Sequence, residues 1–237
     1  DEQVVEKRPA PAPAPSQEPP PSADYLLDLA CREGSGLSCS DASGHTNDLK
    51  LHGVTWINAG SRPALRFDGS NSCAFVPLPS PELQPGPSNA YKQVSLTLEA
   101  WVRPAAWMQT GGVLGYANSP WLFLQRSGEK FQAIFATGCQ TGAYVSAVSK
   151  ADIAAGQWTH LTATVSGDNM ARLYVSGKLA EEKNLGDRIR FASWFPAISV
   201  GIYAKVGNMF AGDLTGIRWW NRAATEAEIA ASAAAAP

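Results

Sequence analysis

The chain has 237 residues, of which 45% are hydrophobic, and a formal net charge of −2. This length and apolar content suffice for one all-β domain with a real core, so we expect one folded domain plus a tail. The nearly neutral charge and the lack of a Lys/Arg cluster argue against nucleic acid as a partner. No apolar run approaches the roughly 20 residues of a membrane-spanning helix, so we expect no membrane insertion.

Residues 1–23 are rich in proline and alanine, with seven prolines between Pro9 and Pro21. Proline has a fixed φ and no backbone N–H, so this segment is predicted to form neither strand nor helix. We expect a disordered, extended Pro/Ala-rich linker. Two interpretations are open: a spacer that holds the folded domain away from an anchor or a neighbouring domain, and a frayed terminus without a task.

The next segments alternate between short strands and loops. Residues 25–29 predict a first strand. The stretch up to residue 53 has Gly, Ser, Asp or Asn at every second or third position, which is typical of a long surface loop. Residues 64–69 and 73–76 predict a strand, a turn and a strand, and the proline-rich residues 77–92 predict a second loop.

The clearest strand lies at residues 96–103, where Leu96, Leu98, Ala100 and Val102 alternate with polar or aromatic residues. Such alternation places one face on a core and the other toward solvent or a second layer. Similar runs predict further strands at 112–117, 121–126, 130–136, 142–148, 197–202 and 213–220.

Residues 156–182 combine three strands with two tight turns. Apolar residues recur at every second position at 161–165 and again at 171–175. The turns at 166–169 and 176–178 contain residues that tolerate positive φ. Hairpins of this kind are marginally stable alone, so they predict a larger antiparallel sheet around them.

Only the end of the chain has a helical pattern. Thr225 and Glu228 form a capping box that opens a short helix, and an Ala-rich tail follows at 232–237. About ten to fourteen strands without a helix between them predict an all-β fold, a two-sheet antiparallel β-sandwich or jelly roll over residues 24–231. The tryptophans expected between the sheets are Trp56, Trp101, Trp158 and Trp219.

Several short motifs follow one another in a characteristic order. They are Glu33-Gly34-Ser35-Gly36, Ala64-Leu65-Arg66-Phe67-Asp68-Gly69, Leu98-Glu99-Ala100-Trp101-Val102-Arg103-Pro104, Trp158-Thr159-His160-Leu161, Leu173-Tyr174-Val175 and Asn221-Arg222-Ala223. This ordered run resembles the laminin-G-like, concanavalin A-like jelly rolls of bacterial extracellular proteins. The resemblance implies the same fold over about residues 24–231. Lectins, adhesion modules, glycosidases and lyases share that fold, so function has to be argued from a site.

Catalysis is the least supported function class. A glycosidase on this fold needs two carboxylates that face each other across a groove. Glu181 and Glu182 are adjacent and point to opposite faces, and Glu99 is isolated on its strand. The resemblance places His160 in a structural motif, as a packed, hydrogen-bonded residue rather than a base. We therefore expect a domain that is not an enzyme.

The four cysteines, Cys31, Cys39, Cys73 and Cys139, include no Cys-x-x-Cys pair and have no histidine at ligand spacing, which argues against zinc. Four cysteines allow three disulfide connectivities. The short separation of Cys31 and Cys39 makes their bridge the easiest to close, and Cys73 would then pair with Cys139 by elimination. The alternative is buried free thiols, as in a cytosolic chain.

A structural calcium ion is the one cofactor that the resemblance raises. Relatives carry an aspartate in two motifs where this chain has Arg32 and Thr215, so the implied site has lost two carboxylates. Asp41 and Asp48 remain as candidate metal ligands, but both also fit Asx turns, which need no ion. We favour the turn interpretation, with a disulfide clamping the loop that calcium clamps in relatives.

The candidate ligand-binding residues are tryptophans in predicted loops or at strand ends: Trp107, Trp121 and Trp194. Sugars stack on exposed aromatic faces, although these residues would serve equally well to seal the ends of the sandwich. We expect a non-catalytic, lectin-like carbohydrate-binding module on a Pro-rich stalk, secreted, periplasmic or displayed at the cell surface. The alternatives are a structural or adhesion domain that binds an extracellular protein and, less favoured, a polysaccharide-degrading enzyme of the same fold.

Overall fold

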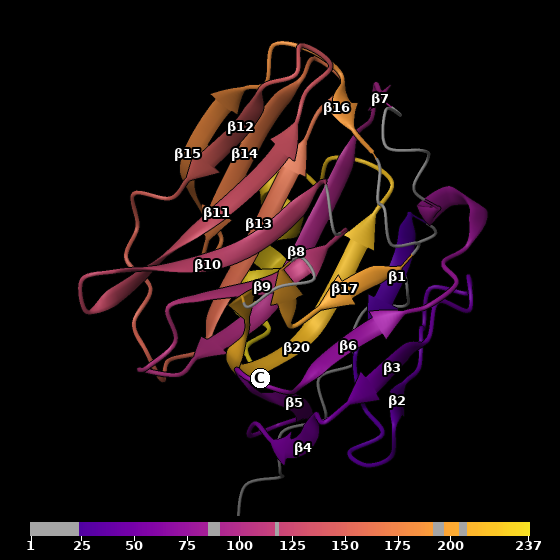
Figure 1. Ribbon diagram of the computed structural model, residues 1–237, viewed down its shortest axis with the longest axis vertical. Coiled ribbons are helices and arrows are strands. Elements are labelled where there is room, and N and C mark those ends of the chain that lie inside the picture. The colour runs from indigo at the N-terminus through magenta and orange to yellow at the C-terminus, as the bar shows by residue number, and fades with distance from the viewer. Residues whose placement is uncertain (1–23, 85–90, 117–118, 192–196, 204–207) are drawn as a thin grey trace, which may run out of the picture.

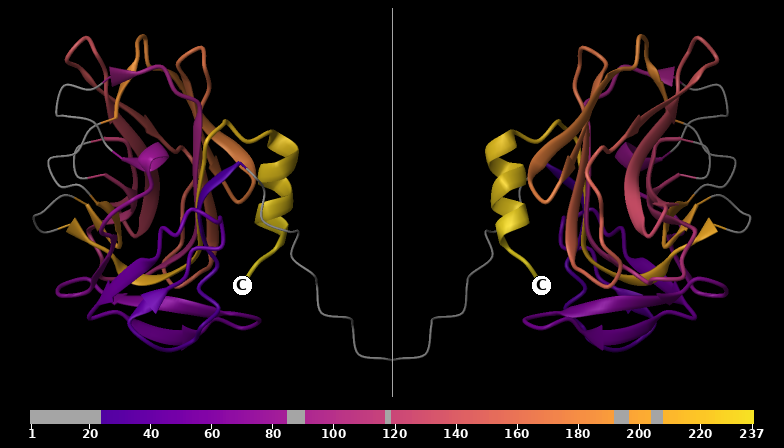
Figure 2. Two further views of the ribbon diagram at one scale, coloured as in Figure 1. Left: turned by 90° about the vertical axis from the view of Figure 1, so that its right-hand side faces the viewer. Right: turned by 90° about the vertical axis from the view of Figure 1, so that its left-hand side faces the viewer.

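The chain forms two stacked antiparallel β-sheets (Figure 1), and one short helix lies on the outside (Figure 2). The computed structural model describes residues 24–84, 91–116, 119–191, 197–203 and 208–237, so the expected linker at 1–23 and Trp194 lie outside the described residues. Each large sheet has eight strands. The predicted all-β jelly roll with a short C-terminal helix is confirmed.

The first sheet is built around the last strand of the chain. Its spatial order is β15 (Lys178–Asn184), β14 (Met170–Val175), β13 (Thr159–Val165), β8 (Leu96–Pro104), β20 (Ala211–Trp220), β5 (Pro63–Asp68) and β4 (Thr55–Asn58). The first strand, β1 (Tyr25–Leu29), also pairs with β20.

The second sheet stacks on the first. Its spatial order is β12 (Tyr144–Val148), β11 (Lys130–Gly138), β10 (Trp121–Ser127), β9 (Thr110–Gly115), β17 (Ile198–Val200), β6 (Cys73–Val76), β3 (Leu49–His52) and β2 (Ser38–Cys39). Two short ribbons pair β7 (Tyr91–Lys92) with β16 (Ile189–Arg190) and β18 (Ile202–Tyr203) with β19 (Asn208–Met209), and a 3₁₀ turn spans Pro81–Leu83.

The core lies between the inner faces of the two sheets, as the sequence alternation predicts. In the register of β8 and β13, Leu98 lies opposite Ala163, and Ala100 lies opposite Leu161. All four side chains are fully buried. Side chains of opposite parity on these strands therefore point to the outer face of the first sheet.

Two of the four tryptophans expected in the core do not lie there. Trp219 is part of it, and Trp56 packs against it. Trp101 has the opposite parity to the core residues of β8, so it lies on the outer face of the first sheet. Trp158, directly before β13, lies on the same face, because it contacts Arg103, which shares the parity of Trp101. There Trp101 contacts the ring of His160, and Trp158 lies beneath the guanidinium of Arg103.

Helix α1 (Glu226–Ala234) covers part of this outer face (Figure 2). Its N-terminus has the predicted capping box of Thr225 and Glu228, and the helix runs three residues into the Ala-rich segment at 232–237. Ile229 is buried against Tyr174 and Trp220 of the sheet. Among the described residues, no helix has the length and apolar character needed to cross a membrane.

Candidate functional site

A groove of about 800 Å³ lies on the outer face of the first sheet, at the end that α1 leaves uncovered. Neighbouring strands supply its floor, and the loop after β8 supplies one wall. The lining includes Thr55, Arg66, Asp68, Arg103, Trp107, Gly156, Gly212 and Asp213. A concave site with one aromatic wall and a few convergent polar groups is typical of small-ligand binding.

A row of charged side chains crosses the floor of the groove. Asp213 on β20 lies opposite Arg66 on β5 and Arg103 on β8, so the three residues are cross-strand neighbours on one face. Asp213 accepts hydrogen bonds from the Nε atoms of Arg66 at 2.7 Å and Arg103 at 2.8 Å. This pairing raises the pKa of Arg66, mainly through the hydrogen bond to Asp213.

Trp107 forms the aromatic wall. It follows Pro104, which ends β8, and its side chain is 62% exposed, as the sequence predicts. Its ring packs over Gly69 and leaves no room for a Cβ there, because a Cβ on Gly69 would lie 2.6 Å from the Trp107 ring. The indole is therefore supported at one edge while most of it faces solvent.

Asp68 fixes the turn beside Trp107. Its Oδ1 accepts hydrogen bonds from the backbone N–H groups of Ser70, Asn71 and Ser72 and from the hydroxyl of Ser72. These hydrogen bonds, those of Ser70 and Asn71 foremost, hold the pKa of Asp68 well below its usual range. The turn is thus rigid, and Asp68 stays ionised.

Asp68 and Asp213 form the one pair of acidic side chains that lines this groove. Sequence reasoning missed the pair because its members lie on β5 and β20, which are far apart in the chain. A glycosidase pair needs one carboxyl with a raised pKa to donate a proton. Asp68 is held ionised by four donors and is therefore not suited to be the acid. Asp213 is 4% exposed, and both of its carboxylate oxygens accept hydrogen bonds from arginines, so it presents no free oxygen to a ligand.

His160 is a packed, hydrogen-bonded residue, as predicted. Its Nε2 lies 3.2 Å from Oε1 of Glu99, and both side chains are buried on the outer face of the first sheet. Glu99 is therefore not isolated, and it also accepts a hydrogen bond from Arg218 at 3.2 Å. Burial alone would raise the pKa of Glu99, but the hydrogen bond with His160 and the charge of Arg218 outweigh it and lower the pKa.

The other two candidate tryptophans do not join Trp107 in the groove. Trp121 is only 5% exposed and lies on β10 of the second sheet, where its ring contacts Tyr144. The expectation that Trp121 is exposed is wrong, because this first residue of β10 packs with Ile134 and Ala136 of the neighbouring β11. Trp194 lies outside the described residues.

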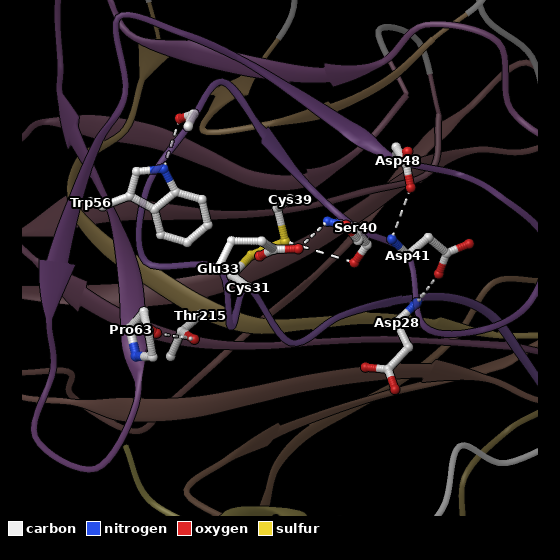
Figure 3. Close-up of a disulfide and its surroundings, with 11 residues drawn as sticks. Asp28, Cys31, Glu33, Cys39, Ser40, Asp41, Asp48, Trp56, Pro63 and Thr215 are labelled. Atoms are coloured by element: carbon white, nitrogen blue, oxygen red, sulfur yellow. Dashed lines mark hydrogen bonds between the residues drawn. A yellow bond between two sulfur atoms is a disulfide. The ribbon is translucent and has the colours of Figure 1, made fainter.

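The loop after β1 is held by Asp41 and a disulfide (Figure 3). The two Oδ atoms of Asp41 accept four hydrogen bonds, from the backbone N–H groups of Asp28, Ser43 and Asn47 and from the Ser43 hydroxyl. Asp48 accepts a hydrogen bond from the backbone N–H of Asp41. Asp41 thus caps a turn, as the turn interpretation predicts, whereas Asp48 bridges two segments of the loop. The calcium ion raised by the resemblance stays a prediction.

Cys31 and Cys39 form the predicted disulfide, with 5.1 Å between their Cα atoms. The predicted pairing of Cys73 with Cys139 is wrong, because both cysteines are free. Cys73 starts β6, and Cys139 follows β11, four strand positions away in the second sheet. At the usual strand spacing this is about 19 Å, far beyond the reach of a disulfide.

Two of the solved structures with the same architecture are binding domains. The binding domain of Paraclostridial Mosquitocidal Protein 1 superposes with a TM-score of 0.69 at 15% identity, over 89% of this chain and 52% of that one. The botulinum neurotoxin serotype D binding domain gives a TM-score of 0.68 at 13% identity, over 90% and 52%. This chain thus spans about half the length of these two domains.

Domain 4 of AbnA, a GH43 extracellular arabinanase from Geobacillus stearothermophilus, is similar over almost its full length. Its structure, in complex with arabinotriose, gives a TM-score of 0.64 at 16% identity, over 89% of this chain and 98% of that one. At these identities the likeness shows the fold alone. A comparison with curated proteins gives no match.

A family model assigns the chain directly. The Laminin_G_3 model, described as the concanavalin A-like lectin/glucanases superfamily, matches residues 79–230, which is more than half of the sequence. The match includes β8, β13 and β20, the strands that form the centre of the first sheet. The chain is a member of the concanavalin A-like lectin/glucanase superfamily.

Proposed function

We propose that this domain is a non-catalytic, extracellular carbohydrate-binding module whose glycan lies in the groove beside Trp107. The observation that carries the proposal is the position of that indole, 62% exposed and supported by Gly69 at the edge of a groove lined by polar groups. Sugars combine apolar C–H faces with hydroxyl groups, so they are held by an aromatic plane together with fixed hydrogen-bonding groups.

The fold neighbours and the disulfide support the same proposal. Domain 4 of AbnA was solved with arabinotriose, and the toxin neighbours are binding domains. The Cys31–Cys39 disulfide fits an oxidising compartment outside the cytosol. In this proposal the Pro-rich residues 1–23 serve as the stalk.

The test is a Trp107→Ala variant measured by glycan array and affinity electrophoresis. Loss of the stacking plane is expected to weaken glycan binding about tenfold or more, which corresponds to roughly 1.4 kcal/mol. The matched control is Tyr144→Ala, which removes another exposed aromatic side chain, 56% exposed, on the second sheet. This control is expected to bind as the parent protein does.

Three results would contradict the proposal. If Trp107→Ala and Tyr144→Ala bound glycans equally well, the groove would not be the binding site. If the parent protein bound no glycan but retained a protein partner in a pull-down, the domain would be an adhesion module. Turnover of a polysaccharide by the purified domain would show catalysis, which the carboxylates of the groove do not support.

A further inference from the structure

The guanidinium groups of Arg66 and Arg103 in the groove have N–H donors that Asp213 does not use. Arg66 uses Nε and Nη2 to bind Asp213, and Arg103 uses only Nε. Among the described residues, Nη1 of Arg66 and both Nη atoms of Arg103 have no hydrogen-bond acceptor. Each arginine has five N–H donors in a planar fork, so several of these donors remain for a ligand.

Both guanidinium groups are already held in place. Asp213 anchors each of them through Nε, and the guanidinium of Arg103 also lies 4.9 Å from the centre of the Trp158 ring. A side chain that is fixed before binding loses little conformational entropy when a ligand arrives. The two arginines therefore present preorganised donors on either side of a buried carboxylate.

The charged side chains of the groove have no net charge together, but they are not equally exposed at its surface. Arg66 and Arg103 balance Asp68 and Asp213, so long-range attraction of an anion is weak. At contact range the pattern differs, because the side chain of Arg66 is 52% exposed and that of Arg103 is 27% exposed, while that of Asp213 is 5% exposed. Asp68 is exposed as well, at the turn beside Trp107, where four donors bind its Oδ1. The exposed charged groups of the groove are therefore two guanidinium groups and one carboxylate. Both Oδ atoms of Asp213 are also occupied by the arginines.

A ligand that matches this surface must accept several N–H groups at once. A hydroxyl group donates as well as accepts, whereas a carboxylate only accepts and fits a guanidinium fork with two parallel hydrogen bonds. We infer that the groove selects glycans that carry a carboxylate, such as a chain of hexuronic acids, with the acid on the arginines and a sugar face on Trp107. This inference rests on the proposed function and adds the chemical class of the sugar.

The test compares polyuronates with their own methyl esters. Polygalacturonate and alginate are each run against the fully esterified polymer, which keeps the sugar backbone and removes the charge. The parent protein is expected to bind at least one acidic form about tenfold more tightly than its ester. Because contact hydrogen bonds carry the preference, it should persist at physiological salt, unlike simple ion exchange.

Variants separate the acid contact from the stacking contact. Arg66→Gln keeps an amide donor for Asp213, which Arg103 still neutralises, and should lower binding of the acidic form about tenfold more than it lowers binding of the ester. Trp107→Ala should weaken binding of both forms. The control Arg172→Gln removes another arginine, on β14 and paired with Glu182, and should change neither.

Each other outcome contradicts a specific claim. Equal binding of acid and ester, or binding of neutral glycans only, would overturn the acid preference and leave the proposed function intact. Another outcome is that the protein binds dextran sulfate as well as polyuronate, with binding that Trp107→Ala does not change and that salt abolishes. That result would show ion exchange and would overturn the acid preference as well. Binding of no glycan at all would overturn both.

Discussion

Gly69 makes the position of Trp107 possible. Its φ of +73° lies in the left-handed region that favours glycine, and its missing side chain leaves room for the indole ring. Asp68, the preceding residue, caps the same turn with one carboxylate oxygen. The exposed aromatic surface is thus set by two small sequence features beside it rather than by Trp107 alone.

Gly69→Ala is expected to reduce glycan binding about as strongly as Trp107→Ala, because the new methyl group would lie 2.6 Å from the ring and displace it. The backbone strain should also lower the free energy of unfolding by about 1–2 kcal/mol. Gly128→Ala is the control for backbone strain alone, since its φ is +63° and its Cβ would meet nothing within 4 Å. It should lose less stability than Gly69→Ala, whose Cβ would also lie 2.7 Å from Cβ of Ala211, and it should keep glycan binding, measured by urea unfolding and affinity electrophoresis. Equal binding by both variants would show that Gly69 does not position the indole.

Sequence reasoning found Trp107 but not its surroundings. Pro104 ends a clear strand, so an aromatic residue three positions later was predicted to be exposed, and this is correct. The same reasoning failed for Trp121, because its position at the start of a strand does not show whether neighbouring side chains cover it. The row formed by Arg66, Asp213 and Arg103 could not be predicted for another reason. The cross-strand register decides which charged side chains are neighbours, and the sequence does not give this register.

Helix α1 is fastened to the first sheet at its N-terminus. Glu228 caps Thr225 and also accepts hydrogen bonds from Arg222 at 2.7 and 2.9 Å. Arg222 further donates to Asp24 at the start of the described chain. Hydrogen bonds from Arg222, foremost, lower the pKa of Glu228 from 4.5 to about 2.

Glu228→Gln is expected to cost about 0.5–1 kcal/mol of stability near neutral pH, a modest value because the pair is more than a third exposed. The folded-state pKa lies below the unfolded value, so the ionised pair contributes fully above about pH 4.5 and its contribution is lost as pH falls toward about 2. The stability difference between parent and variant should therefore shrink with acidification in urea unfolding curves. Glu226→Gln, in the same helical turn, is the control. A difference that stayed constant with pH would show that Glu228 acts through packing rather than charge.

At the scale of elements, the long strands were predictable and the short ones were not. Period-two alternation located β8, β13, β14 and β20 within a few residues, and the capping box located α1. The segment predicted as one long loop contains β2 and β3, each of at most four residues. Such short strands lack enough alternation to be recognised, and they form because β6 and the disulfide hold them in the sheet.

At the scale of the molecule, the loop after β1 is closed by a covalent bond. The Cys31–Cys39 disulfide joins the end of β1, in the first sheet, to β2, in the second. Asp41 closes the adjoining turn with four hydrogen bonds. This arrangement supports the hypothesis that the disulfide takes the role that calcium has in relatives.

The double variant Cys31→Ser and Cys39→Ser is expected to lose about 2–3 kcal/mol of unfolding free energy. Without the disulfide, the unfolded chain gains conformational entropy, because the loop between two residues at a sequence separation of 8 is no longer closed. Chelation by EDTA should leave the melting temperature of the parent protein unchanged. Cys73→Ser is the control for loss of a thiol, since Cys73 is free. A lower melting temperature with EDTA, restored by calcium, would instead establish the metal site at Asp41 and Asp48. Mass spectrometry that found Cys31 and Cys39 both free in protein from its native compartment would remove the disulfide hypothesis.

The position of β20 has a consequence for biosynthesis. This strand, Ala211–Trp220, pairs with β8, β5 and β1, which all come from the first half of the chain. A nascent polypeptide cannot join these three strands into the first sheet until β20 has been synthesised. Completion of the sheet thus depends on contacts between segments that are distant in the sequence, which makes this step slow. Premature termination before residue 211 would leave unpaired strand edges, a state prone to aggregation.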